Sequence, residues 1–344
     1  MVVKAEEMRI ESLVFVSLLV LLVSCNMELS ERTREVVDRI NEEDALVFDD
    51  IGFRHDKPKR DFSLMLDSVA SDRELVFLAD GGGTSLIRYF SFASLLKRNS
   101  KLCKGVLVHH LKDKDSITVR ICVHEEYIEP LLDRMIKIYQ NRLDKSEEEK
   151  KDSMYIDSLL LCTPSVPCIS YYEKLFKTMP LKDNWYKTVK AKYQQDQNAF
   201  ALLALARYKR NEDKVLIVRA LRNYHKVSPA TRWIAIDAVQ LWPDKTYFKL
   251  LADIVKIAKE DFVTEGMIEA LVAYSDKPSY DVLQSVLEYS ASKYGDDEFP
   301  DYSFIIMSAC VKTGTRLYDS LLEKYPPRED MFTKMLKMSV NEKN

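Results

Sequence analysis

Apolar residues recur with helical spacing through most of this chain, and the pattern is clearest in residues 190–326. There, apolar and small residues form four successive pairs of short runs separated by polar connections. Spacing of this kind is typical of amphipathic helices that pack side by side. The first helices of the pairs are expected at 199–208, 233–242, 267–274 and 304–312, and the second helices at 215–221, 247–251, 280–283 and 317–322.

The four first helices share a small residue at matching positions, namely Ala204, Ala238, Ala270 and Ala309. Small side chains let neighbouring helix axes approach closely. The first helices end near Tyr208, Trp242, Tyr274 and Lys312, which lie 34, 32 and 38 residues apart. A period of this size indicates stacked helical hairpins. Residues 190–326 therefore resemble HEAT-type repeats of an α-solenoid, and residues 61–112 resemble them more weakly. A non-repetitive helical bundle is the alternative.

The first half of the chain is also helical, with one interruption. Ser71 and Glu74 have the spacing of a capping box, which predicts the start of a helix. Residues 117–123 alternate between apolar and polar side chains, which predicts a short strand. The expected fold class is therefore mainly all-α, a solenoid of HEAT-like hairpins with one short strand segment near 117–123.

Composition agrees with a helical fold and excludes several other classes. The chain has only 8 glycines in 344 residues, whereas nucleotide-binding α/β folds and all-β sandwiches need glycine at many turns. A hydrophobic content of 47% is enough for a core. The formal net charge of −3 provides no broad basic field, so we expect no nucleic-acid partner.

The amino-terminal region carries a targeting pattern. The apolar run from Leu13 to Val23 is too short to span a bilayer but matches the core of a signal peptide. It leads into Leu22-Val23-Ser24-Cys25, which resembles the lipobox of bacterial lipoproteins. An ordinary secretory signal, or an uncleaved helix with a chance cysteine, is the alternative.

The lipobox resemblance implies that residues 1–24 are removed and that Cys25 is acylated, with palmitate or a similar fatty acid. It also implies a protein of the bacterial cell envelope that membrane lipid holds in place. Each buried methylene contributes about 0.8 kcal/mol, so several acyl chains make a durable anchor. Asn26 stands where an Asp would favour the inner membrane, which points weakly to the outer membrane.

The predicted organisation follows from these patterns. It comprises a signal peptide (1–24), a lipid-anchored tether with the first helix (25–60), an N-terminal helical region (61–150), a connecting segment (151–189), the HEAT-like repeats (190–326) and a tail (327–344).

Residues that carry chemistry are few. His109, His110, His124, Glu125 and Glu126 are the best candidates. Adjacent histidines point about 100° apart on a helix, so they do not readily share one metal ion. The three glycines before Thr84 superficially resemble a phosphate-binding turn, but the Walker spacing is missing, which favours a simple turn between helices. We expect no catalytic residue, metal or cofactor.

The sequence therefore favours a non-enzymatic interaction scaffold with an envelope protein as partner. The charged and aromatic residues between Asp144 and Tyr193 are a candidate contact zone, although tyrosines also line helix seams. The alternative is an envelope enzyme, or a lipoprotein that binds a glycan or small molecule around His109 and His124. Cys162 and Cys168 can close a small disulfide loop in an exported protein, or remain as two unpaired thiols.

Overall fold

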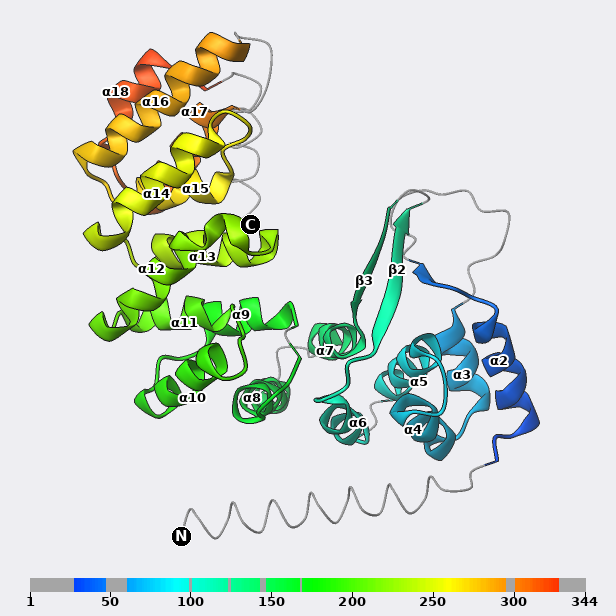
Figure 1. The fold of residues 1–344 in the computed structure, drawn as a ribbon. Helices are drawn as coiled ribbons and strands as arrows, with labels where there is room; N and C mark the ends of the chain where they lie inside the picture. Colours follow the sequence, from blue (N-terminus) through cyan, green and yellow to red (C-terminus); the bar gives the residue numbers. More distant parts are fainter. Residues whose placement is uncertain are drawn as a thin grey trace. The chain divides into compact units, whose positions relative to one another are not determined.

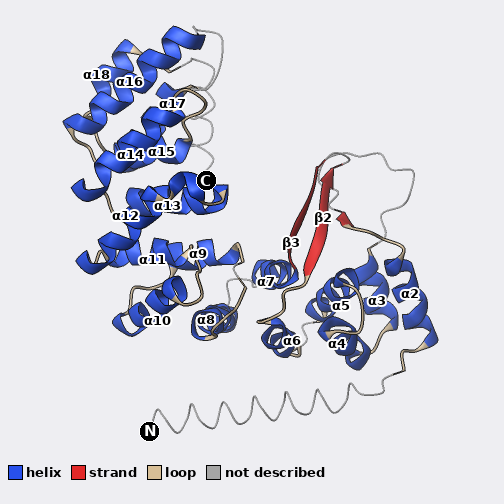
Figure 2. Cartoon of the chain, viewed as in Figure 1, coloured by secondary structure: helices blue, strands red, loops and turns tan. Residues whose placement is uncertain are grey.

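The protein is built mainly of α-helices, as its sequence predicts (Figures 1 and 2). Its computed structural model describes residues 28–47, 61–98, 101–122, 125–142, 147–167, 169–294 and 301–327. These residues form 17 α-helices, two short 3-10 helices and one three-stranded sheet. They divide into two compact units between Leu175 and Phe176, inside the predicted connecting segment.

The first unit is organised around α5 (Ser85–Lys97), which contacts helices from both sides of it in the chain. Phe92 and Leu95 of α5 are fully buried and form the centre of this core. The other helices of the unit are α2 (Glu31–Asn41), α3 (Phe62–Val69), α4 (Asp72–Asp80), α6 (Cys103–His110), α7 (Leu131–Arg142), α8 (Glu147–Cys162) and α9 (Tyr171–Thr178), the last of which continues past the division.

A small sheet completes the first unit. Its central strand β2 (Ser116–Cys122) confirms the predicted strand, and it pairs in parallel with β1 (Leu46–Val47) and antiparallel with β3 (Glu125–Pro130). Ile117 and Val119 are buried because they face the core, where β2 contacts α5 and α7. Such alternation along β2 is what one buried face of a sheet requires.

One carboxylate holds two helix starts together in this unit. Glu74 completes the predicted capping box of α4, where its Oε2 accepts hydrogen bonds from the backbone N–H of Ser71 at 2.7 Å and from the Ser71 hydroxyl at 2.8 Å. Its Oε1 also accepts a bond from the backbone N–H of Ser30, the N-cap of α2, at 2.7 Å. Burial would raise the pKa of Glu74, but these hydrogen bonds outweigh it and lower the pKa to about 2.

We expect Glu74→Gln to destabilise the protein in a pH-dependent way. The folded pKa lies below the ordinary value of 4.5, so the carboxylate's stabilisation is complete above pH 4.5 and is lost as the pH falls toward 2. The expected loss in the free energy of unfolding is about 2–3 kcal/mol at pH 7. Urea unfolding followed by circular dichroism from pH 7 to pH 3 measures it.

Exposed Glu35 of α2 supplies the control, since Glu35→Gln should change stability by less than about 0.5 kcal/mol at any pH. If the free energy of unfolding that Glu74→Gln removes does not become smaller as the pH falls, this assignment is wrong.

The second unit is a stack of helical hairpins, and all eight helices expected from the sequence are present. The helices α11 (Ala201–Tyr208), α13 (Pro229–Leu241), α15 (Glu265–Val272) and α17 (Tyr302–Thr313) contact one another in succession and form one layer. The helices α12 (Lys214–Arg222), α14 (Lys245–Ala258) and α16 (Lys277–Tyr294) do the same and form a second layer. The remaining elements are α10 (Asp183–Gln194), η1 (Asn211–Asp213), η2 (Tyr224–Lys226) and α18 (Asp319–Lys324).

Small residues lie where the layered helices meet. Ala204, Ala238 and Ala270 are fully buried, and Ala309 is 2% exposed. Each pair of helices packs against the next pair along the chain, so the apolar face of one hairpin is covered by its neighbours.

None of the helices that the structure describes combines the length and the apolar character needed to cross a bilayer.

Candidate functional site

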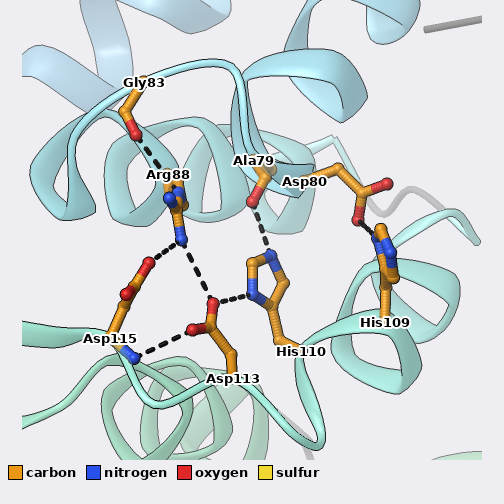
Figure 3. Close-up of polar contacts among 8 residues, drawn as sticks. All are labelled: Ala79, Asp80, Gly83, Arg88, His109, His110, Asp113 and Asp115. Atoms are coloured by element: carbon orange, nitrogen blue, oxygen red, sulfur yellow. Dashed lines mark hydrogen bonds and ion pairs between the residues drawn. The ribbon is translucent and has the colours of Figure 1, made fainter.

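His109 and His110, two of the histidines singled out in the sequence, each contact a residue at the end of a neighbouring helix. His109 and His110 are the last two residues of α6, and their rings contact successive residues at the end of α4 (Figure 3). His109 is about half exposed and lies 2.6 Å from the Asp80 carboxylate, whereas His110 is buried. Glu125 begins β3, and His124 lies outside the described residues. The two histidines therefore fasten α6 to α4 through separate contacts.

His110 belongs to a closed polar network. Its Nε2 lies 2.7 Å from the carbonyl oxygen of Ala79, and its Nδ1 lies 2.8 Å from the Asp113 carboxylate. Both ring nitrogens therefore have partners inside the protein.

Asp113 is held ionised by its neighbours. It accepts bonds from the backbone N–H of Asp115 at 2.8 Å and from Arg88 at 3.1 Å, besides its contact with His110 (Figure 3). Burial raises the pKa of Asp113, but these donors together lower it below its usual value. Arg88 also pairs with Asp115 and donates to the carbonyl of Gly83 at 3.2 Å. The carboxylates of Asp113 and Asp115 are therefore both paired with the guanidinium of Arg88.

The glycine run beside this network is a turn between helices, as the sequence favours. Gly81 ends α4 with a φ of +151°, a conformation that side chains rarely adopt. A Cβ on Gly82 would come within 2.8 Å of the Phe77 ring, and one on Gly83 within 2.7 Å of Ile87. The run is thus packed against its own neighbouring helices, and Thr84 caps the helix that follows.

We expect the two histidines to differ sharply when replaced. His110→Ala removes the side-chain partner of the Ala79 carbonyl and one of the three partners of the Asp113 carboxylate, and it empties a buried site, which should lower the free energy of unfolding by about 2–4 kcal/mol. His109→Ala removes one exposed pair and should cost less than about 1 kcal/mol. Chemical denaturation of both variants measures the difference. Equal losses would show that the His110 contacts do not hold α4 and α6 together.

Neither metal binding nor catalysis gains support from these side chains. In the part of the chain that the structure describes, no group of three or more His, Cys, Asp or Glu side chains is placed to hold a metal ion. Because His124 lies outside the described residues, the alternative of an enzyme around His109 and His124 stays a prediction.

The other sequence candidates lie in or beside regions that the structure does not describe. Cys25 and Cys168 both fall outside the described residues, while Cys162 is exposed at the end of α8, so lipidation and the disulfide stay predictions. In the candidate contact zone, Tyr171, Tyr172 and Tyr186 are all buried. They line helix seams, which was one of the two roles expected of the tyrosines.

The second unit contains a groove that the sequence did not reveal. It has a volume of about 310 Å³ and is open to solvent. Lys177 of α9 lies at one end of the groove, and α13, α15 and α17 line the rest. Its lining residues are Lys177, Asp237, Gln240, Leu241, Glu269, Ala273, Ala309, Lys312 and Thr313.

Two ion pairs cross the groove between neighbouring helices. Lys177 Nζ lies 2.7 Å from the Asp237 carboxylate, and Lys312 Nζ lies 2.6 Å from the Glu269 carboxylate. The Gln240 amide donates to the second oxygen of Glu269 at 3.3 Å. Hydrogen bonding to Glu269 raises the pKa of Lys312, so this lysine stays charged. The groove therefore has a mainly apolar lining with two ion pairs among its lining residues.

One signal in the sequence could have pointed to it. Asp237 and Glu269 each stand directly before a buried alanine of the helix stack, Ala238 and Ala270. An acid at a matching place in two successive hairpins lies on the same side of the stack, because the hairpins repeat.

Comparison with known proteins yields no relative. No protein-family model, no curated protein and no solved structure matches this chain.

Proposed function

We propose that this protein is a lipoprotein of the bacterial cell envelope that acts as an interaction scaffold. Its acylated Cys25 anchors it to a membrane, in keeping with the lipobox pattern of Leu22 to Cys25. Its second unit is a HEAT-like solenoid that holds a segment of a partner envelope protein. Helical-repeat arrays commonly bind partners along an extended surface of this kind.

The groove along α13, α15 and α17 is the observation that carries the proposal. It is open to solvent and is lined by three successive helices of one layer, so a segment of polypeptide that lies in it can contact each of them. Its paired charges and its small alanines offer both polar partners and space. A partner segment that enters this channel contacts several hairpins at once, which gives specificity without a catalytic residue.

A groove-filling substitution tests this proposal. Ala273 lines the groove, and Ala273→Trp should fill it and weaken partner binding by at least about tenfold. Mild crosslinking of cells, followed by detergent extraction, should recover the native chain with a stoichiometric protein partner and the variant without one. Exposed Ala291 of α16 is the matched control, and Ala291→Trp should keep the partner. Recovery of the native chain only as free monomer, or retention of the partner by Ala273→Trp, would contradict the proposal.

A further inference from the structure

The acidic and basic side chains that line the groove of the second unit differ in how exposed they are. The acids are the less exposed members, since the side chains of Glu269 and Asp237 are 16% and 25% exposed. The lysines that pair with them are more exposed, at 59% for Lys312 and 38% for Lys177. Carboxylates thus form the floor, and ammonium groups lie at the rim.

The charged side chains that line the groove balance, with two carboxylates and two ammonium groups, and additional negative charge lies beside them. A third acid, Glu265, stands next to the lining, 4.0 Å from Lys312. The lining residues also lie at the carboxyl ends of their helices: Leu241 ends α13, Thr313 ends α17 and Ala273 directly follows α15. The carboxyl end of a helix carries a partial negative charge of about half an elementary charge. The groove therefore attracts cations.

The apolar part of the lining suits a long side chain that ends in a cation. Leu241, Ala273 and Ala309 provide methyl and methylene surface between the acids. Arginine and lysine place their methylene stems along such surface while their charged ends reach carboxylates. The resident lysines already bind the acids in this way, and exposed ion pairs exchange partners at little cost.

We infer that the groove receives a basic side chain, an arginine or lysine of the partner polypeptide, with Glu269 and Asp237 as its acceptors. This inference rests on the proposed function and adds the chemical class of the bound segment. The incoming cation takes the place of Lys312 or Lys177 at the carboxylates, and the displaced lysine turns toward solvent. Arginine suits the site better than lysine because its planar guanidinium binds a carboxylate through two parallel hydrogen bonds.

Selection from a random peptide display library against the full chain in detergent tests the inference. Peptides that bind the native chain, and that Ala273→Trp no longer retains, should be enriched in arginine and lysine. The binding of these peptides should weaken as ionic strength rises, because the pairing is electrostatic. Replacing the enriched arginine by citrulline, its neutral isostere, should weaken binding by about tenfold.

An acid and a lysine of the groove should have different effects on peptide binding when they are replaced. Glu269→Gln removes an acceptor and should weaken binding of the selected peptides by about tenfold. Lys312→Met removes the competing cation and should leave binding unchanged or strengthen it, by up to about tenfold. Exposed Glu288 of α16 pairs with Lys324 at 3.5 Å, and Glu288→Gln serves as the control that should change nothing. Circular dichroism confirms that each variant is folded.

The outcomes separate this inference from the proposed function. Groove-dependent peptides that lack basic residues, or that bind more weakly to Lys312→Met than to the native chain, overturn the basic-ligand assignment and leave the scaffold proposal standing. A library without any binder that depends on the groove overturns both.

Discussion

Asp133→Ala should lower the free energy of unfolding by about 3–5 kcal/mol, the largest effect that we expect from a single polar residue. Asp133 lies in the first turn of α7 and is 1% exposed. Its carboxylate accepts bonds from the Ser170 hydroxyl at 2.6 Å and from the backbone N–H groups of Ser170 and Tyr171 at 3.2 and 3.0 Å. These residues begin α9, so Asp133 caps that helix from another part of the chain.

The size of the loss follows from what the substitution leaves behind. Alanine would leave the buried Tyr171 N–H without an acceptor, at a cost of about 1–3 kcal/mol, and would also remove the acceptor of the two part-buried Ser170 donors. Lys137, which lies 3.3 Å from Asp133, would keep only Glu129 as a partner at 2.7 Å. Asp133→Asn retains one acceptor oxygen and should lose less, about 2 kcal/mol.

Urea denaturation measures this prediction, with Asp281→Asn as the matched control. Asp281 pairs with Lys277 at 2.8 Å, but both side chains are more than half exposed. Such a surface pair contributes less than about 1 kcal/mol. If Asp133→Ala costs no more than Asp281→Asn, then Asp133 does not cap α9 as described.

Loss of Cys25 should remove the protein's lipid altogether. In a lipoprotein the cysteine carries the lipid through its sulfur, so Cys25→Ser should abolish incorporation of labelled palmitate. A chain that starts at Asn26 behind an ordinary secretory signal should move from the membrane fraction to the soluble fraction. A single acyl chain binds membranes only reversibly, whereas two or more hold a protein durably, so this redistribution should be nearly complete.

Mass spectrometry of the mature amino terminus provides the direct readout. The prediction is a chain that begins with acylated Cys25 and lacks residues 1–24. An unmodified amino terminus from native cells would contradict the anchor, as would a chain starting at Asn26 that still sediments with membranes.

Local patterns in the sequence were enough to predict much of the fold. The eight helices of the second unit were predictable because each hairpin repeats its apolar face and its small residue, such as Ala238 or Ala270. The capping box of Ser71 and Glu74 was predictable because the two residues bond within one turn. The strand β2 was predictable because one of its faces is buried.

Features made by distant residues were not predictable in this way. The strand β3 contains Glu125 and Glu126 and shows no clean alternation, so only its pairing with β2 identifies it. Asp133 and Ser170 are 37 residues apart, and nothing near either one indicates that they meet. The adjacent pair His109 and His110 also gave no sign of which ring is buried, because that depends on where α4 lies.

The groove could not be predicted from the sequence either, because residues that are distant along the chain form it. Its ion pairs join residues from different helices, and Lys177 and Asp237 are 60 positions apart (237 − 177). The sequence placed its best candidates at His109 and His124, because histidine is rare and chemically versatile. The common residues that line the groove become a site only when the hairpins are stacked.

Photo-crosslinking from inside the groove tests the central claim most directly. A photoreactive amino acid at Thr313, on the groove's edge, should join the full-length protein to one discrete polypeptide in living cells. The same amino acid at exposed Lys256 of α14, in the other helix layer, should not. A discrete product at position 313 that disappears when Ala273→Trp fills the groove is the predicted result. The absence of any product at 313, or the same product from both positions, would contradict a partner held in the groove.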